Sequence, residues 1–223
     1  MKTFAGSAVN FFTSLKNPVK LPAGISVINP YESEERREIV AKFYDKYFND
    51  SNQRIFIVGI NPGRFGGGST GIAFTDPFNL EKYCGIKNNL NKQTELSSKF
   101  IYKLINNFGG PEKFYGKFFL TALYPLALIN NGKNFNYYDS KEVYNSLKDE
   151  IINSFKNQLS FGADKNVVIC LGKKNNLYLK EINNELNYFE KIIVFDHPRY
   201  IMQYKFKNVN DYILQYTQIL NDL

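Results

Sequence analysis

The sequence predicts an α/β fold built on a mostly parallel, four-stranded sheet. Four short apolar runs, dense in Ile, Val and Phe, do not alternate with polar residues, as is typical of parallel strands that helices cover on both faces. Segments with helical spacing separate these runs, and this alternation favours a doubly wound sheet with right-handed crossovers. The 223 residues, 43% hydrophobic and 22% charged, suit one globular domain that spans residues 1–223.

The predicted strands cover residues 55–59, 118–122, 167–172 and 192–195. The predicted helices cover residues 33–48, 96–108, 140–159, 176–186 and 208–220. A Ser-Glu-Glu start suits the beginning of the first of these helices, and a Gly-Gly pair closes the second.

Two further segments carry weaker signals. Phe11, Phe12 and Leu15 have near-helical spacing and indicate a short packed helix, so residues 1–26 are interpreted as an N-terminal helix and extension. Residues 63–95 show little periodicity. A connection of that length in a compact domain is more often functional than not.

The composition indicates which kind of binding partner and which cellular compartment to expect. The 28 Lys and Arg residues outnumber the 21 Asp and Glu residues, and a net charge of +7 favours an anionic partner, nucleic acid first, although a Lys-rich proteome gives the same numbers. Cys84 and Cys170 form no C-x-x-C, so neither a metal site nor an oxidising compartment is expected. We find no signal peptide and no membrane span, and we expect a cytoplasmic monomer.

Polar and glycine-rich segments follow the predicted strands, and ligands of such sheets bind beyond the carboxyl ends of the strands. Residues 59–71 are glycine-rich but match neither a Walker A loop nor Gly-x-Gly-x-x-Gly, so no nucleotide cofactor is expected. The glycines permit close approach of a ligand, unless the segment is merely a flexible surface loop.

His197 is the only histidine, and it follows a predicted strand and precedes a proline. A lone histidine is more often structural than catalytic. As a neutral imidazole at the edge of the sheet, it can donate a hydrogen bond to charge that develops on a leaving group. Asp196 is its neighbour in sequence, but neighbours on a strand point to opposite faces, so the two are not expected to form a dyad.

These placements lead to a family. The glycine-rich segment after the first predicted strand contains Gly59-Ile60-Asn61-Pro62-Gly63, Phe65-Gly66, Thr70-Gly71 and Phe74. Through these residues it resembles the first motif of the single-strand-selective monofunctional uracil-DNA glycosylases. A strand followed by His197-Pro198 is similar to the second motif of that family. The resemblance covers most of the chain from about residue 27 onward.

The resemblance implies a metal-free, cofactor-free DNA glycosylase of base-excision repair with a three-layer α/β/α fold, which takes a flipped nucleotide into a pocket. Asn61 would orient the attacking water, Phe74 would stack on the base, and His197 would stabilise the departing oxyanion. The remaining base-binding candidates are Gly59, Ile60, Pro62, Gly63, Phe65, Ala122 and Tyr124. The DNA-binding candidates are Arg64, Pro198, Arg199, Tyr200, Ile201, Met202 and Lys205.

Two departures leave the excised base open. Ala122 stands where the family reads uracil with an Asn, and a methyl group cannot make that bidentate contact. Tyr124 either supplies a different contact or packs as an aromatic. After Pro198, apolar Ile201 and Met202 either wedge a base step or begin a packed helix.

Three hypotheses remain. The first is a monofunctional glycosylase for a damaged or deaminated base, with a uracil-type lesion foremost. The second is a catalytically weak or silent module that binds single-stranded nucleic acid through its aromatic residues and positive charge. The third, a less favoured one, is an enzyme that cleaves the same bond in free nucleosides.

Overall fold

A four-stranded parallel sheet forms the middle of the molecule, which confirms the predicted fold class. The computed structural model describes residues 3–18 and 20–223. The strands are β2 Arg54–Gly59, β3 Phe118–Ala122, β6 Ala163–Leu171 and β7 Lys191–Phe195. They pair in the order β3-β2-β6-β7, and every neighbouring pair is parallel. All residues of β2 and β3 are buried, which explains the unbroken apolar runs.

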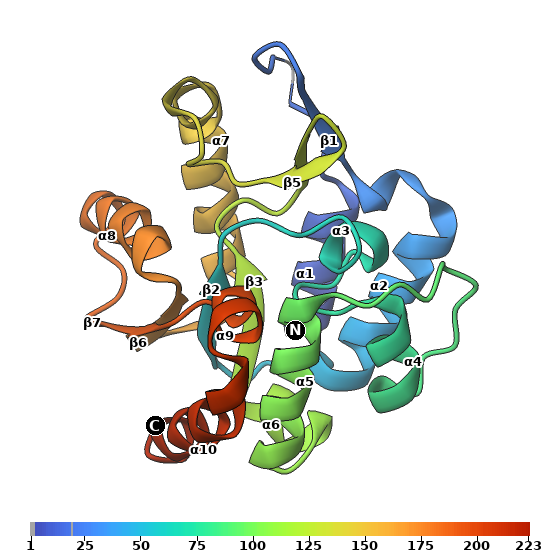
Figure 1. Ribbon diagram of the computed structural model, residues 1–223, viewed down its shortest axis with the longest axis vertical. Helices are drawn as coiled ribbons and strands as arrows, with labels where there is room; N and C mark the ends of the chain where they lie inside the picture. The colour runs from blue at the N-terminus through green and yellow to red at the C-terminus, as the bar shows by residue number, and fades with distance from the viewer. Residues whose placement is uncertain (1–2, 19) are drawn as a thin grey trace.

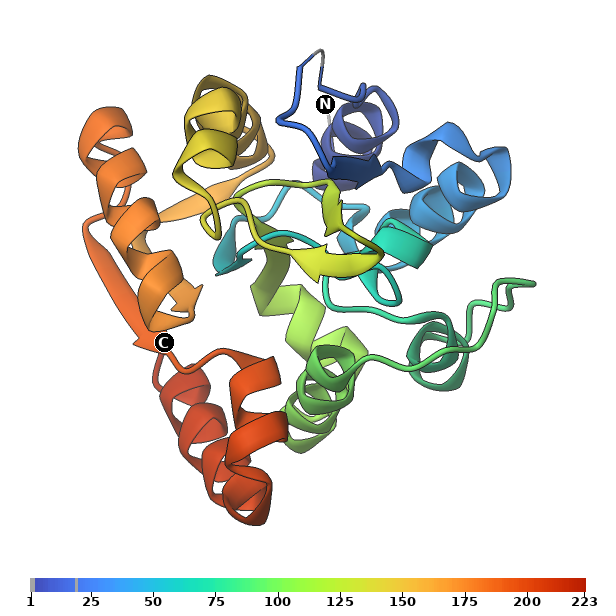
Figure 2. The ribbon, with the colours of Figure 1, turned by 45° about the horizontal axis from the view of Figure 1, so that its top comes forward.

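Helices cover both faces of this sheet and complete three layers. Figures 1 and 2 show α5, α9 and α10 together on one side, and Figure 2 shows α1, α7 and α8 along the other. The longer helices are α1 Phe4–Thr13, α2 Glu34–Phe48, α5 Leu96–Phe108, α7 Lys141–Leu159, α8 Lys173–Leu186 and α10 Val209–Asn221. The shorter ones are α6 Pro111–Lys117 and α9 Pro198–Tyr204, with single 3-10 turns at η1 Pro30–Glu32 and η2 Phe206–Asn208.

Adjacent aromatic residues of β3 pack against the two outer layers. Phe118 meets Phe108 of α5, with ring centroids 5.4 Å apart. Phe119 faces the other way and meets Phe4 of α1 at 4.9 Å. Because successive side chains of a strand point to opposite faces, one strand anchors helices on both sides of the sheet.

A small antiparallel sheet was not predicted. Strand β4 Ala127–Asn130 pairs with both β1 Ile25–Ile28 and β5 Lys133–Phe135. Three- and four-residue strands are too short for a clear pattern. The sequence does contain a signal for this hairpin, the Asn131-Gly132 pair between β4 and β5. Both residues have positive φ, 47° and 71°, as the tight turn of an Asn-Gly hairpin requires.

The segment 63–95 is not the unbroken loop that its lack of periodicity indicated. It contains α3 Gly67–Thr70 and α4 Pro77–Cys84, one and two turns long, which is too short to show a hydrophobic period. The Asp76 carboxylate caps α4 by accepting the Asn79 N–H at 2.8 Å. At the N-terminus, residues 1 and 2 of the predicted helix lie outside the described residues.

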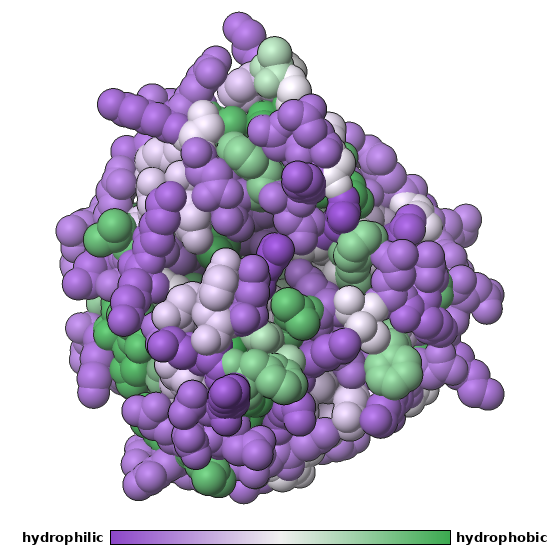
Figure 3. All heavy atoms as spheres, in the orientation of Figure 1, coloured by the Kyte–Doolittle hydropathy of each residue, from purple (hydrophilic) through white to green (hydrophobic). Residues whose placement is uncertain are grey.

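The face of the molecule that Figure 3 shows is mainly hydrophilic. On the face drawn in Figure 3, hydrophobic residues form separate spots among polar ones. Within the described ranges, no helix has the length and apolar character needed to cross a membrane.

Candidate active site

A pocket opens where β2 and β3 reach their carboxyl ends. The loop after β2, the ends of β3 and β5, the residues that precede α5 and the start of α9 all contribute to it. Its walls include Ile60, Asn61, Pro62, Gly63, Phe74, Glu95, Ser97, Ala122, Asn134, Asn136, His197 and Arg199. The fold therefore brings Asn61 and Phe74, from the segment after β2, together with His197 from the far end of the sequence, at the edge where ligands of such sheets bind.

Asn61 is held by both ends of its amide group. Its Nδ2 donates to the carbonyl oxygen of Phe135 at 2.9 Å, and its Oδ1 accepts the backbone N–H of Tyr137 at 3.2 Å. These bonds assign the amide orientation and fix the side chain on the segment after β5. The Oδ1 keeps a second lone pair, with which it can accept a hydrogen bond from a water molecule.

A buried polar chain supports Asn61 from behind. The Tyr137 hydroxyl donates to Asn175 Oδ1 at 2.7 Å, and Asn175 Nδ2 donates to the carbonyl oxygen of Val58 at 3.3 Å. Tyr137 and Asn175 are both fully buried. The segment that clamps Asn61 is thus tied to α8 and to β2, so its position is set by rigid elements.

Phe74 forms one wall of the pocket in an unusual backbone conformation. Its φ is +56°, in the left-handed region that residues other than glycine rarely adopt. The ring packs over Gly59, where any Cβ would collide with it. Gly59 therefore does not face a ligand itself; it leaves the space in which the Phe74 ring lies.

His197 presents a neutral imidazole with a defined tautomer. Its Nδ1 accepts the backbone N–H of Arg199 at 3.2 Å, so the proton of the neutral ring is on Nε2. Burial, and secondarily the Arg199 guanidinium, lower the pKa of His197 to about 4. The ring centroids of His197 and Phe74 are 6.1 Å apart. At neutral pH the pocket thus contains an uncharged N–H donor near the Phe74 ring.

Asp196 points away from His197, in agreement with the sequence analysis. Its carboxylate accepts a hydrogen bond from the Tyr212 hydroxyl at 3.2 Å and lies 3.7 Å from Lys173 Nζ. The Nδ1 of His197 is already occupied by a backbone donor. No triad of the hydrolase type is therefore built here.

Four predicted contact residues are buried in the protein and do not line the pocket. Tyr124 is fully buried because the chain turns after β3, where the Tyr124 N–H donates to the Ile60 carbonyl at 3.1 Å. Pro198 is buried at the first position of α9. Ile201 and Met202 form the inner face of the same helix. Of the two interpretations of this segment, the packed helix is correct.

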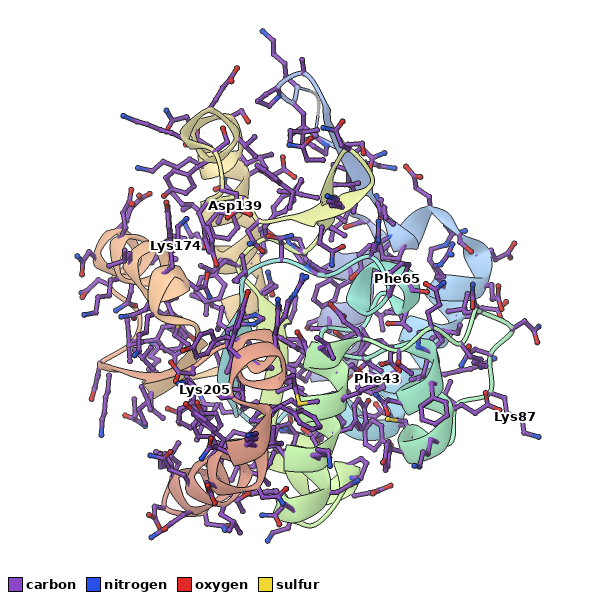
Figure 4. All side chains as sticks on the ribbon, in the orientation of Figure 1. Phe43, Phe65, Lys87, Asp139, Lys174 and Lys205 are labelled. Atoms are coloured by element: carbon purple, nitrogen blue, oxygen red, sulfur yellow. The ribbon has the colours of Figure 1, made fainter. Side chains whose placement is uncertain are left out.

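The remaining candidates lie on the segment after β2 and on or just after α9. The Arg64 guanidinium stacks on the ring of Phe65, 4.4 Å from its centroid. Arg199, Tyr200 and Lys205 are exposed on or just after α9. Figure 4 shows Phe65 beside α3 and Lys205 beside α9, on either side of the middle of this face.

Sequence reasoning missed one acidic residue in the pocket. Glu95 precedes α5, and burial raises the pKa of its carboxyl group to about 7. An acid before a helix is common and gives no signal by itself. Cys84 and Cys170 are both buried, and in the described part of the chain no three His, Cys, Asp or Glu side chains gather into a potential metal site.

Comparisons with known proteins find relatives of this chain in sequence and in fold. The profile of the uracil DNA glycosylase superfamily matches residues 46–221. A crystal structure of wild-type Pedobacter heparinus SMUG2 superposes with a TM-score of 0.95 at 41% sequence identity, covering 100% of this chain and 98% of that one. A search of curated proteins found no match.

Proposed function

The chain belongs to the uracil DNA glycosylase superfamily, and we propose that it is a monofunctional glycosylase that excises a uracil-type base from DNA in base-excision repair. The observation that carries the proposal is the pairing, in one pocket, of a clamped Asn61 with a neutral His197 whose proton is on Nε2. A hydrolytic glycosylase needs both: one group to place water and one to stabilise the leaving base.

The reaction is hydrolysis of the bond between C1′ of the sugar and a nitrogen of the base. As that bond breaks, the sugar acquires oxocarbenium character and the base leaves with negative charge on a carbonyl oxygen. The Nε2–H of His197 donates to that oxygen. Asn61 Oδ1 accepts a hydrogen bond from the water that attacks C1′, and the Phe74 ring stacks on the extruded base.

Helix α9 offers a path for the DNA strand beside the pocket. Tyr200 and Tyr204 lie one turn apart with ring centroids 5.6 Å apart, and they are 43% and 66% exposed. Phe206 follows at 67% exposure, flanked by Lys205 and Lys207. Exposed rings interleaved with cations suit the stacking of unpaired bases next to phosphate contacts.

Replacing both Tyr200 and Tyr204 with alanine is expected to weaken binding of single-stranded DNA by about tenfold or more, because each lost base stack costs ~1–3 kcal/mol. The measurement is fluorescence anisotropy with a labelled oligonucleotide at fixed salt. Phe78→Ala is the matched control, since Phe78 is an aromatic residue of similar exposure, 42%, on α4. Equal affinities for all three proteins would remove the two tyrosines from the DNA path.

A lesion panel tests the activity. Oligonucleotides that carry uracil, 5-hydroxymethyluracil, hypoxanthine or xanthine, single- and double-stranded, are incubated with the protein and then treated with alkali. We expect strand cleavage at uracil. Absence of cleavage at every lesion, with salt-sensitive DNA binding retained, would instead support the binding module that the replacement of the family Asn by Ala122 first suggested.

A further inference from the structure

The proposed function leaves open which group reads the edge of the base. Ala122 ends β3 and lines the pocket, but its methyl group can neither donate nor accept a hydrogen bond. A site that flips a base without a polar group for the base edge would discriminate poorly. Another side chain of the same pocket, a polar one, must then contact the base edge. Glu95 has the properties to make this contact.

The backbone of Glu95 is fixed at the start of α5. Its N–H donates to Asp76 Oδ2 at 2.9 Å, and its carbonyl oxygen accepts the N–H of Lys99 at 2.9 Å. The first bond links Glu95 to Asp76, which caps α4, and the second belongs to the first turn of α5. The side chain is thus directed into the pocket from a backbone held at both ends.

Two glycines of the loop after β2 make room for the carboxyl group. A Cβ on Gly63 would collide with one oxygen of Glu95, and a Cβ on Gly66 would collide with the other. At both positions, the missing side chain of glycine leaves the space that the carboxyl group occupies. The glycine-rich loop of the family motif therefore also accommodates the carboxyl group of Glu95, a residue that lies outside that motif.

The carboxyl group of Glu95 is available to a ligand. Its side chain is mostly buried, and among residues 3–18 and 20–223 it has no hydrogen-bond partner. Three titratable or charged groups face it or share the pocket: Arg199 from α9, Asp76 from the start of α4 and His197. Burial raises the pKa of Glu95 to about 7, Asp76 adds to the effect and Arg199 opposes it. Near neutral pH a large fraction of the group is therefore protonated.

We propose that Glu95, as a neutral carboxylic acid, takes over the reading of the base and binds the lactam edge that uracil and hypoxanthine share. The O–H of the acid donates to the ring carbonyl oxygen, and its C=O accepts the adjacent ring N–H. A carboxylic acid offers one donor and one acceptor, as the carboxamide of Asn does, whereas a carboxylate offers acceptors only and repels the carbonyl oxygen. The inference rests on the proposed function and assigns its specificity residue.

The test compares wild type with Glu95→Gln, Glu95→Ala and Gly66→Ala on single-stranded DNA that carries uracil, from about pH 6 to about pH 9. Wild-type kcat/KM is expected to fall by about tenfold or more over this range, because the acid ionises. Glu95→Gln keeps a donor and an acceptor at every pH, so its activity should be retained and nearly independent of pH. The titration of His197 cannot produce this profile, since its pKa of about 4 lies well below the range.

Glu95→Ala and Gly66→Ala are expected to lose about 10–100-fold in kcat/KM at the lower pH, the value of one bidentate base contact. Gly66→Ala keeps the acid but displaces it, so a loss there shows that its position matters. Affinity for an oligonucleotide with non-cleavable 2′-fluoro-2′-deoxyuridine should fall in parallel, which a defect confined to bond cleavage would not produce. Circular dichroism verifies that each variant is folded.

The outcomes separate the inference from the proposed function. Wild-type activity on uracil with an unchanged rate and pH profile in Glu95→Gln and Glu95→Ala would overturn the role of Glu95 and leave the glycosylase assignment intact. An inactive wild type would contradict the glycosylase assignment itself. Loss in Glu95→Ala with an equal loss in Glu95→Gln would also overturn the inference, because the amide preserves the proposed hydrogen-bond pattern.

Discussion

His197→Ala is expected to reduce the rate of base excision by about 10²–10³-fold, the usual cost of removing one donor to a developing oxyanion. The reason lies in the tautomer: Nδ1 accepts the Arg199 N–H, so Nε2–H is free to donate, and burial keeps the ring neutral. The affinity for DNA should change little, because the bond to the oxyanion strengthens only as the base departs.

Single-turnover kinetics with a uracil oligonucleotide measure this effect. Asp196→Asn is the matched control, because Asp196 is adjacent in sequence but bonds to Tyr212, outside the pocket. A wild-type rate in His197→Ala would remove the histidine from the mechanism. A large loss in Asp196→Asn would show that the carboxylate acts on the reaction after all.

Asn61→Ala is expected to lower the excision rate by about 100-fold or more, because the water that attacks C1′ loses the acceptor that orients it. Binding of the non-cleavable 2′-fluoro-2′-deoxyuridine oligonucleotide should be retained, since Phe74 and the rest of the pocket remain. The two measurements together distinguish water positioning from base binding.

The hydrogen bonds of Asn61 require a structural control. Its amide also holds the backbone of Phe135 and Tyr137, so the alanine variant could disturb the segment after β5. Tyr137→Phe removes only the bond to Asn175 behind that segment. If Tyr137→Phe lost as much activity as Asn61→Ala, the effect would come from the support of the segment and not from the water.

The central sheet was predictable because parallel strands buried on both faces leave unbroken apolar runs, as in β2 and β3. The short elements were not predictable, because α3 has four residues and β5 has three, and so few residues show no hydrophobic periodicity. The hairpin at Asn131 and Gly132 could have been found from its turn residues.

The site shows the same division. Asn61 and Phe74 belong to one motif after β2, and His197 follows β7 far along the sequence, so their meeting at one edge of the sheet was predictable. Tyr124 is the second residue after the end of β3 and is buried, in agreement with the packed aromatic that was one of its two interpretations. Glu95 gave no sequence signal, because the space that two glycines leave for it exists only in the folded chain.

The most direct test of the account is the analysis of the products from single-stranded DNA that contains one uracil. We expect free uracil in equal amount to an intact strand with an abasic site, which breaks only after alkali, and release of both products about 10²–10³-fold more slowly in His197→Ala. A strand that the protein itself cleaves, or no free base from the wild-type protein while a control glycosylase releases it, would contradict a monofunctional glycosylase that acts through this pocket.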